Sequence, residues 1–335
     1  MKNYWYIATP SDALKKQPIA RMIDGVPLVV FRAEDGRAAA LADRCSHRNV
    51  QLSRGRIEDG CLSCPYHGWA FDAAGQCVKI PSLCEGDPIP AKSAIRAFPV
   101  IEQQGYVWVF VGDGDPEAAR PFHLPHMEEA GWAWTRLEAT IANSAANLVE
   151  NFIDCPHTGF IHRGLFRTAP DHAAETVVRT RADGVDIDID EEAKSRSLLG
   201  RLVLKAGEKV AHVDSFHMPF IVSVRYAFGD RREVVGYQIC TPVSDLETRV
   251  HVHVTWRLGA WAPLIAPIVR VMGRKVLAQD RWILENQGQQ IRRFGEDFCS
   301  SQADTANLWI RNLRNRVLRG EDPMSDREKR VRFRL

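Results

Sequence analysis

Two short pairs of cysteine and histidine are the residues of this chain best suited to chemistry. Cys45 and His47 form the first pair, and Cys64 and His67 form the second pair after the sixteen residues 48–63. Two thiolates on one iron and two imidazoles on the other are the ligands of one type of [2Fe–2S] cluster, and the neutral imidazoles raise its reduction potential above that of an all-cysteine cluster. The pairs therefore predict a centre that transfers single electrons.

A structural zinc ion is the alternative occupant, because zinc takes the same ligand types. However, the first pair has Cys-x-His spacing, whereas zinc sites more often begin with two cysteines. The second pair lies in the sequence Cys-Pro-Tyr-His-Gly-Trp at residues 64–69, where proline and glycine favour a tight loop that brings backbone N–H groups toward sulfur. Strand-like sequence follows each pair. These features favour the cluster.

The four residues and their spacing closely resemble the Rieske iron–sulfur domain, whose Cys-x-His and Cys-x2-His pattern they match in full. The resemblance implies that all four ligate a [2Fe–2S] cluster. Rieske proteins of respiratory complexes carry a further cysteine in each loop, and these two join as a disulfide. Val50 and Tyr66 stand at those places here, so we expect the lower-potential cluster of ferredoxins and oxygenases.

A second group of candidate metal ligands lies in residues 147–162. Glu150, Asp154 and His157 would share one face of a helix, because they are spaced by four and three residues. An intervening proline and glycine would kink or end that helix and let His162 approach the same ion as His157. Two histidines and a carboxylate on one side of Fe(II) leave positions open for dioxygen and substrate. Two ordinary histidines near a helix end are the alternative.

The order Asp-x2-His-x4-His downstream of a Rieske motif resembles the Rieske non-haem iron oxygenases, most of all their smaller members without a β subunit. The resemblance implies that His157 and His162 ligate a mononuclear iron and that an aspartate on a C-terminal helix, shortly before a glutamate, is the third ligand. Asp280, which precedes Glu285, fits this place. The alternatives are a surface aspartate near a helix start, or ligation by Glu285 or Asp297.

Asp154 has a different role by resemblance. In the family this aspartate joins a cluster-ligating histidine of one subunit to an iron-ligating histidine of the next, because the two centres of one chain lie too far apart. We therefore expect a head-to-tail homotrimer in which Asp154 contacts His157 of its own chain and His67 of a neighbour. A local cap or ion pair is the alternative. Glu150 stands where many family members have asparagine, and it stays outside the expected ligand set.

Short strands joined by turns are predicted around the cluster loops. Apolar runs at Pro27–Arg32 and Ala38–Asp43 flank a Glu-Asp-Gly turn, and Gly105–Val111 reads as a further strand. The glycine- and aspartate-rich segment 112–116 leads out of this region. Residues 1–118 are therefore expected to form an all-β Rieske domain.

Residues 119–335 are expected to form a mononuclear iron catalytic domain, which makes the chain α+β. Alternating apolar residues indicate strands in four segments: Thr176–Ile189, His212–Tyr226, Glu233–Pro242 and Thr248–Leu258. A helix that contains Asp280 and runs to about Phe294 has apolar residues at helical spacing. An antiparallel sheet wrapped around a long C-terminal helix agrees with the helix-grip (START/Bet v1-like) fold that the resemblance implies.

The composition predicts no nucleic-acid or membrane partner. The 335 residues are 45% hydrophobic and 26% charged, with a formal net charge of +2, which gives no large cationic field. The N-terminal residues lack the apolar core of a secretory signal, and Leu258–Met272 is too short to span a bilayer, so we expect a cytoplasmic location. Six of the eight cysteines lie outside the Cys-His pairs and are expected to be free thiols.

The resemblance implies an oxidoreductase, the oxygenase component of a multicomponent Rieske monooxygenase. It would use O2, and electrons that a ferredoxin or flavin reductase takes from NAD(P)H, to hydroxylate or oxidatively demethylate a small aromatic substrate at a mononuclear Fe(II). The chain looks similar to vanillate and dicamba demethylases, toluenesulfonate methyl-monooxygenases and guanidinium-toxin hydroxylases. The alternatives are a ring-hydroxylating dioxygenase, whose α subunit is usually longer, and a Rieske electron-transfer protein with a non-catalytic second domain.

Overall fold

A computed structural model describes residues 1–163, 165, 173–191, 210–229, 231–259, 262–323 and 326–334. The chain divides into two units, Met1–His123 with Thr241–Ser244 and Leu124–Cys240 with Asp245–Leu335. Among the described residues no helix has both the length and the apolar character needed to cross a membrane.

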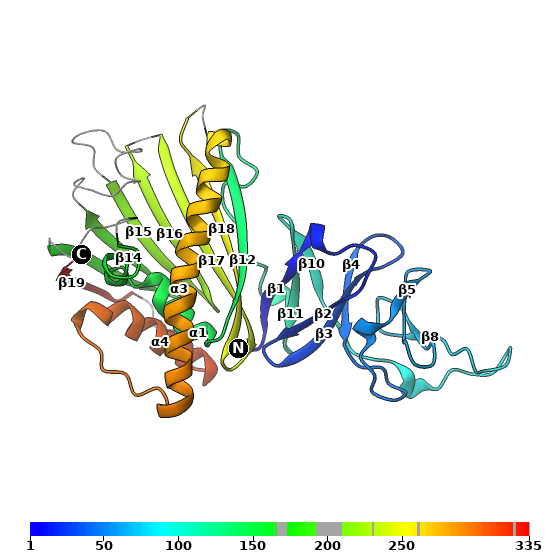
Figure 1. Cartoon of the computed structure of the whole chain (residues 1–335). Coiled ribbons are helices and arrows are strands. Elements are labelled where there is room, and N and C mark those ends of the chain that lie inside the picture. The colour runs from blue at the N-terminus through cyan, green and yellow to red at the C-terminus, as the bar shows by residue number, and fades with distance from the viewer. Residues whose placement is uncertain are drawn as a thin grey trace. The chain divides into compact units, whose positions relative to one another are not determined.

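The first unit is built from three antiparallel sheets, with the strand orders β1-β11-β10, β2-β3-β4-β9 and β5-β6-β7-β8 (Figure 1). Its strands are β1 (Tyr4–Pro10), β2 (Ile19–Ile23), β3 (Val26–Arg32), β4 (Ala38–Ala42), β5 (Arg56–Glu58), β6 (Cys61–Ser63), β7 (Ala70–Phe71), β8 (Cys77–Lys79), β9 (Ala97–Phe98), β10 (Val100–Gln103) and β11 (Tyr106–Val111).

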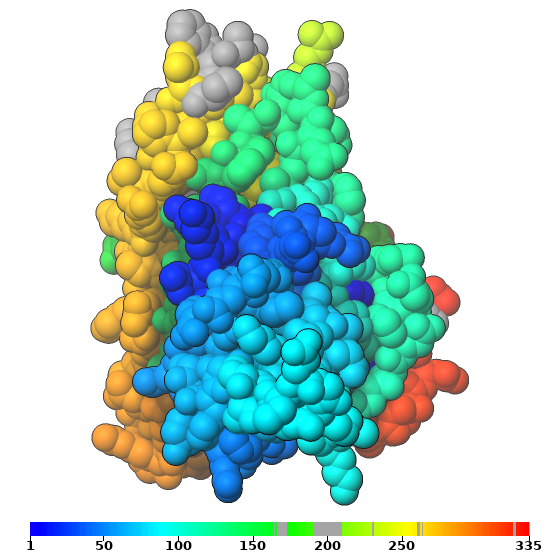
Figure 2. All heavy atoms as spheres, turned by 90° about the vertical axis from the view of Figure 1, so that its right-hand side faces the viewer, coloured from blue at the N-terminus to red at the C-terminus, as the bar shows by residue number. Residues whose placement is uncertain are grey.

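Apolar sequence on both faces of a strand explains the core of this unit. The six residues of β11, Tyr-Val-Trp-Val-Phe-Val, are all buried, as expected for a continuous apolar run in the centre of a sheet. The predicted strands at Pro27–Arg32, Ala38–Asp43 and Gly105–Val111 are confirmed within one residue at each end as β3, β4 and β11. The segments coloured light blue to cyan form an exposed face of this unit (Figure 2).

The second unit contains an eight-stranded sheet in the order β12-β18-β17-β16-β15-β14-β13-β19. Its strands are β12 (Ala133–Ile141), β13 (Ala173–Arg181), β14 (Gly184–Glu191), β15 (Val210–His217), β16 (Ile221–Phe228), β17 (Arg232–Ser244), β18 (Glu247–Arg257) and β19 (Glu328–Arg334), and its helices are α1 (Ala145–Ile153), α3 (Ala266–Phe294) and α4 (Thr305–Leu318).

The three helices pack on the sheet, and the long helix α3 runs along it (Figure 1). The predicted helix end at Phe294 is confirmed, and because α3 begins at Ala266, Asp280 lies at the middle of the helix. The alternating stretch Thr176–Ile189 is a hairpin of two strands, because β13 and β14 turn between Arg181 and Gly184. The predicted fold class, an all-β domain followed by a large antiparallel sheet with C-terminal helices, is confirmed.

Candidate metal centres

The two Cys-His pairs lie in two loops of the first unit, one after β4 and one between β6 and β7. The N–H of Cys45 donates to the carbonyl of Val50 at 2.9 Å, and the N–H of Cys64 donates to the carbonyl of Trp69 at 2.8 Å. Gly68 donates to the Cys64 carbonyl at 3.0 Å and has a φ of 69°, a left-handed conformation that glycine adopts without strain. The backbone of each loop is therefore fixed around its cysteine.

The two thiols of these loops are buried together. Cys45 is 1% exposed and Cys64 is 2% exposed. Burial raises the pKa of the Cys45 thiol to about 11, and its hydrogen bond with Cys64 contributes to that rise. Buried thiolates need an adjacent positive charge, so the pair fits a metal centre that supplies one.

The imidazoles of His47 and His67 lie together, with ring centroids 4.5 Å apart. Nδ1 of His47 is buried and has no hydrogen-bond partner among the described residues, which is costly unless a metal binds it. Burial and the nearby His67 lower the pKa of His47, which favours the neutral imidazole that ligates metals. Two adjacent thiols and two adjacent imidazoles fit a Rieske cluster.

The segment with the second group of candidates is only partly helical. Helix α1 ends at Ile153, and Asp154 is its C-cap, while His157 lies in a short 3-10 helix that begins at Pro156. Proline has no N–H to continue the helical hydrogen bonds. The prediction that Glu150, Asp154 and His157 share one helix face is therefore wrong, since only Glu150 lies on α1.

His157, His162 and Asp280 nevertheless come together in the second unit. One donor atom of each lies within 4.8 Å of the other two. Oδ1 of Asp280 is 3.0 Å from Nε2 of His162 and 3.7 Å from Nε2 of His157. The side chains of His162 and Asp280 are 3% and 5% exposed. Two imidazoles and one carboxylate that converge in a site shielded from solvent fit a non-haem Fe(II).

Neighbouring acceptors orient the two imidazoles. Nδ1 of His162 lies 3.0 Å from Oε1 of Gln279, and Nδ1 of His157 contacts the carbonyl oxygen of Asp154. An acceptor at Nδ1 holds the proton there and leaves Nε2 available for a metal. Gln279 is a residue that the sequence reasoning missed, although it directly precedes Asp280.

The pKa values of His157 and His162 shift in opposite directions. Burial lowers the pKa of His157. Burial also acts to lower the pKa of His162, but the hydrogen bond and the charge of Asp280 outweigh it and raise that pKa.

Asn151 donates from Nδ2 to Oδ1 of Asp280 at 3.2 Å. The sequence reasoning missed Asn151 as well, and the available signal was that it directly follows Glu150, the place where many family members have asparagine.

Asp280 lies on helix α3, and its position depends on how closely α3 approaches the segment before α1. A Cβ on Gly288 of α3 would lie 2.2 Å from the carbonyl oxygen of Ala142. Asn143 donates to the carbonyl of Leu284 at 2.8 Å and to Oε1 of Gln287 at 2.9 Å. The small residue and the asparagine together hold α3 against the segment that leads into α1.

The two acidic residues of the α1 region have different surroundings. Oδ2 of Asp154 lies 3.7 Å from Nδ1 of His157, and burial, with the charge of Asp304, raises the pKa of Asp154 to about 7. Glu150 instead accepts three hydrogen bonds from Arg311 at 2.8, 2.9 and 3.1 Å. Glu150 is therefore held in an ion pair and does not belong to the triad.

The alternative carboxylates for the triad have other environments. Glu285 pairs with Arg281 at 2.8 Å, and Asp297 is exposed. All eight cysteines are free thiols, which confirms the prediction for the six outside the Cys-His pairs.

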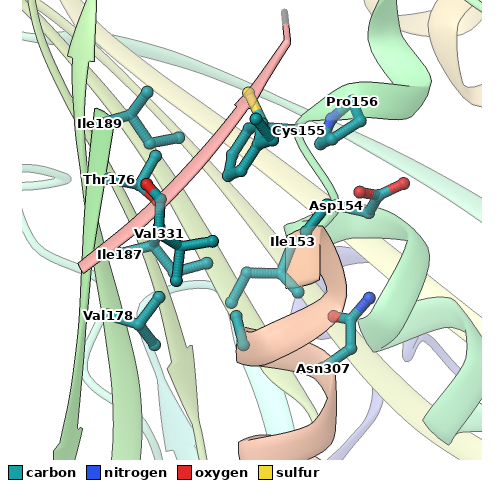
Figure 3. Close-up of a pocket in the computed structure, with 13 residues that line it drawn as sticks. Ile153, Asp154, Cys155, Pro156, Thr176, Val178, Ile187, Ile189, Asn307 and Val331 are labelled. Carbon is teal, nitrogen blue, oxygen red and sulfur yellow. The ribbon is translucent and has the colours of Figure 1, made fainter. Parts of the chain in front are cut away.

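A small pocket lies beside the loop that carries Asp154. Apolar side chains of β13 and β14, among them Val178 and Ile187, face Ile153 across it, and the carboxylate of Asp154 is turned away from this apolar wall (Figure 3). The pocket has room for little more than a water molecule. An organic substrate does not fit in it.

The sequence matches two family models in the same order as the two sites. The Rieske [2Fe-2S] domain matches residues 4–99, and the vanillate O-demethylase oxygenase C-terminal domain matches residues 141–320, more than half of the chain. The chain belongs to the Rieske oxygenase family. The Rieske match also decides between an iron–sulfur cluster and zinc in favour of the cluster.

Rieske oxygenases similar to this chain include the dicamba O-demethylase oxygenase component of Stenotrophomonas maltophilia, 36% identical over 171 residues, which are 50% of this chain and 49% of the relative. Chloroplastic chlorophyllide a oxygenase of Chlamydomonas reinhardtii is 34% identical over 341 residues, 96% of this chain and 50% of the relative. The chain thus spans about half the length of these curated relatives.

A crystal structure of dicamba monooxygenase bound to dicamba shares the fold. It superposes with a TM-score of 0.83 at 23% identity and covers 95% of this chain and 97% of that chain. The likeness extends over both units of the chain and agrees with the order of the two matched domains.

Proposed function

We propose that this chain is the oxygenase component of a multicomponent Rieske monooxygenase. It uses O2 and reductase-supplied electrons to hydroxylate or oxidatively demethylate a small aromatic substrate. The observation that carries the proposal is the buried triad of His157, His162 and Asp280 in a chain that also has a complete Rieske motif. An electron carrier has no use for such a triad.

The proposal assigns two sets of ligands. Cys45, His47, Cys64 and His67 hold the [2Fe–2S] cluster, in a domain at residues 1–118. The cluster supplies single electrons and the mononuclear iron activates dioxygen.

The iron is assigned to the triad, in a catalytic domain at residues 119–335. The residues around the triad prepare it for the ion. Gln279 and the Asp154 carbonyl accept at the two Nδ1 atoms, so both Nε2 atoms point to the iron position. Asn151 holds the carboxylate of Asp280 in place. Because His162 and Asp280 are nearly inaccessible to water, their electrostatic interaction with an ion is strong.

The working assembly is proposed to be a head-to-tail homotrimer. His67 and the neighbouring Tyr66 are exposed on the first unit, so a second subunit can approach the cluster-side imidazole. Asp154 lies next to His157, and in the trimer its carboxylate would accept from His67 of the neighbour. One carboxylate that accepts from His67 of the neighbour and lies 3.7 Å from Nδ1 of His157 would connect the two centres.

A ferredoxin or flavin reductase that oxidises NAD(P)H is the proposed partner, and the cytoplasm is the proposed location. Curated relatives named as oxygenase components support the reductase. The formal net charge of +2 gives no reason to add a nucleic-acid partner.

The test combines metal analysis with turnover. Purified protein should contain iron beyond the amount that its acid-labile sulfide accounts for, and a panel of aromatic acids and methyl ethers with a surrogate reductase should show substrate-dependent O2 uptake. A hydroxylated or demethylated product supports a monooxygenase, and a cis-diol would indicate a ring dioxygenase. Iron at cluster stoichiometry only, with no O2 uptake, would favour an electron carrier and refute the proposal.

A further inference from the structure

A second group of side chains of the types that ligate metals lies in the second unit and has no role in the proposed reaction. Cys155 follows the C-cap of α1, and His212 and Asp214 lie two residues apart on β15, so both point to the same face of the sheet. Cys155, His212 and Asp214 are 7%, 2% and 3% exposed. These three residues, here called the Cys155 trio, come from segments far apart in the sequence.

The Cys155 trio shares a distance limit and one short nitrogen–oxygen distance with the proposed iron triad. One donor atom of each member lies within 4.8 Å of the others, a limit that the iron triad also meets. In each group an imidazole Nε2 lies close to a carboxylate Oδ1, at 2.9 Å between His212 and Asp214 and at 3.0 Å between His162 and Asp280. The two groups share no residue. Within the described residues no other group of three or more such side chains converges this closely.

We propose that Cys155, His212 and Asp214 bind a second divalent ion of the zinc class. Zinc binds thiolate, imidazole and carboxylate in one site, whereas magnesium and calcium take oxygen ligands. The thiolate also distinguishes the ligand set of this site from that of the iron triad, which offers two imidazoles and a carboxylate. A dication balances the negative charges of a thiolate and a carboxylate, and this lowers the cost of burying them.

The surroundings of the trio are apolar on the strand side. Ile187 pairs with Asp214 across the sheet, and Ile189 pairs with His212, so these four side chains lie on one face. The isoleucines form a wall opposite Cys155 (Figure 3). Apolar surroundings lower the local dielectric constant, and this strengthens the attraction between an ion and its ligands. Three protein ligands leave a coordination position for a water or another small ligand.

Zinc-edge X-ray absorption of the iron-loaded holoenzyme with added Zn2+ tests the proposal directly. The expected result is bound zinc with one sulfur neighbour at about 2.3 Å, because zinc in the iron triad would show nitrogen and oxygen neighbours only. Cys155→Ser should abolish the sulfur neighbour. Cys299→Ser, which changes an exposed cysteine, is the matched control and should retain it.

A second variant keeps the test decisive if Cys155→Ser does not fold. His212→Gln should weaken Zn2+ binding at least about 10-fold, measured by equilibrium dialysis with mass-spectrometric zinc analysis, while the cluster absorbance and the triad iron stay unchanged. His217→Gln on the same strand should bind Zn2+ as the wild type does. The proposal is overturned if wild-type zinc has no sulfur neighbour, if Cys155→Ser keeps it, or if His212→Gln binds Zn2+ as tightly as the wild type.

Discussion

The substitution Gly288→Ala is expected to destabilise the second unit, because α3 approaches the chain before α1 too closely for a methyl group. An added Cβ would lie 2.2 Å from the carbonyl oxygen of Ala142 and 3.3 Å from its carbonyl carbon, so α3 would have to move by about 1 Å to reach normal contact. That shift weakens the bonds from Asn143 to Leu284 and Gln287. Overpacking costs about 1–3 kcal/mol and the weakened hydrogen bonds about 1 kcal/mol, while the better helix propensity of alanine offsets about 1 kcal/mol. The net loss is about 1–3 kcal/mol.

Thermal unfolding followed by circular dichroism measures this loss. A change of 1 kcal/mol shifts the Tm of a domain this size by about 2–4 °C. Gly273→Ala is the matched control in the same helix, because its Cβ would meet only the flexible end of Leu137, Cδ1 at 2.7 Å, and it should keep or slightly raise the Tm. Asp280 lies about two turns before Gly288, so Gly288→Ala should also retain less mononuclear iron. A Gly288→Ala protein at or above the wild-type Tm would refute the packing argument, as would a larger loss in Gly273→Ala.

Three further predictions concern the residues around the triad. Asp154→Asn should leave the iron and sulfide contents unchanged but reduce turnover by orders of magnitude, and wild-type rates in this variant would contradict the inter-subunit role. Gln279→Ala and Asn151→Ala should each weaken Fe(II) affinity about 10–100-fold in equilibrium dialysis, whereas Arg281→Ala, on the exposed side of α3, should leave it unchanged. Because burial raises the pKa of Asp154 in the folded chain to about 7 from an ordinary 3.8, the folded state binds this proton more tightly than the unfolded state. This group therefore lowers stability as pH rises from about 4 to about 7. Urea unfolding midpoints across that range should fall less steeply in Asp154→Asn, and an unchanged slope would contradict the assignment.

The cluster loops could be predicted from the sequence because all their chemistry is local. Each loop brings one thiol and one imidazole within a few residues, and turn residues such as Gly68 fix the backbone between them. The strands of the first unit were also predictable, since apolar runs such as Gly105–Val111 are bounded by turn signals. In the first unit, patterns within a few neighbouring residues predict the loops and strands, and the structure agrees with them closely.

The parts that depend on distant contacts were harder to predict. Asp280 was found through resemblance to a family, because no local spacing connects it to His157 and His162. Helix α1 ends at Ile153, earlier than the face-sharing argument required, because the chain turns before Pro156.

The supporting side chains were harder still. Gln279 and Asn151 are polar residues on amphipathic helices, where a solvent-facing role is the ordinary expectation. The Cys155 trio joins a loop to a strand, and strand alternation shows only that His212 and Asp214 share a face. Nothing in the sequence indicates that Cys155 lies opposite them.

Electron paramagnetic resonance of the reduced protein with nitric oxide tests the central claim most directly. Nitric oxide converts mononuclear Fe(II) with open coordination positions into a high-spin iron–nitrosyl species. The signal of this species is distinct from the low-spin signal of the reduced Rieske cluster. We predict both signals in the wild type, and loss of the nitric oxide signal alone in Asp280→Ala and in His162→Ala. An iron-replete wild type without the nitric oxide signal would contradict the claim that His157, His162 and Asp280 form an oxygen-activating iron site, and so would its persistence at full intensity in Asp280→Ala.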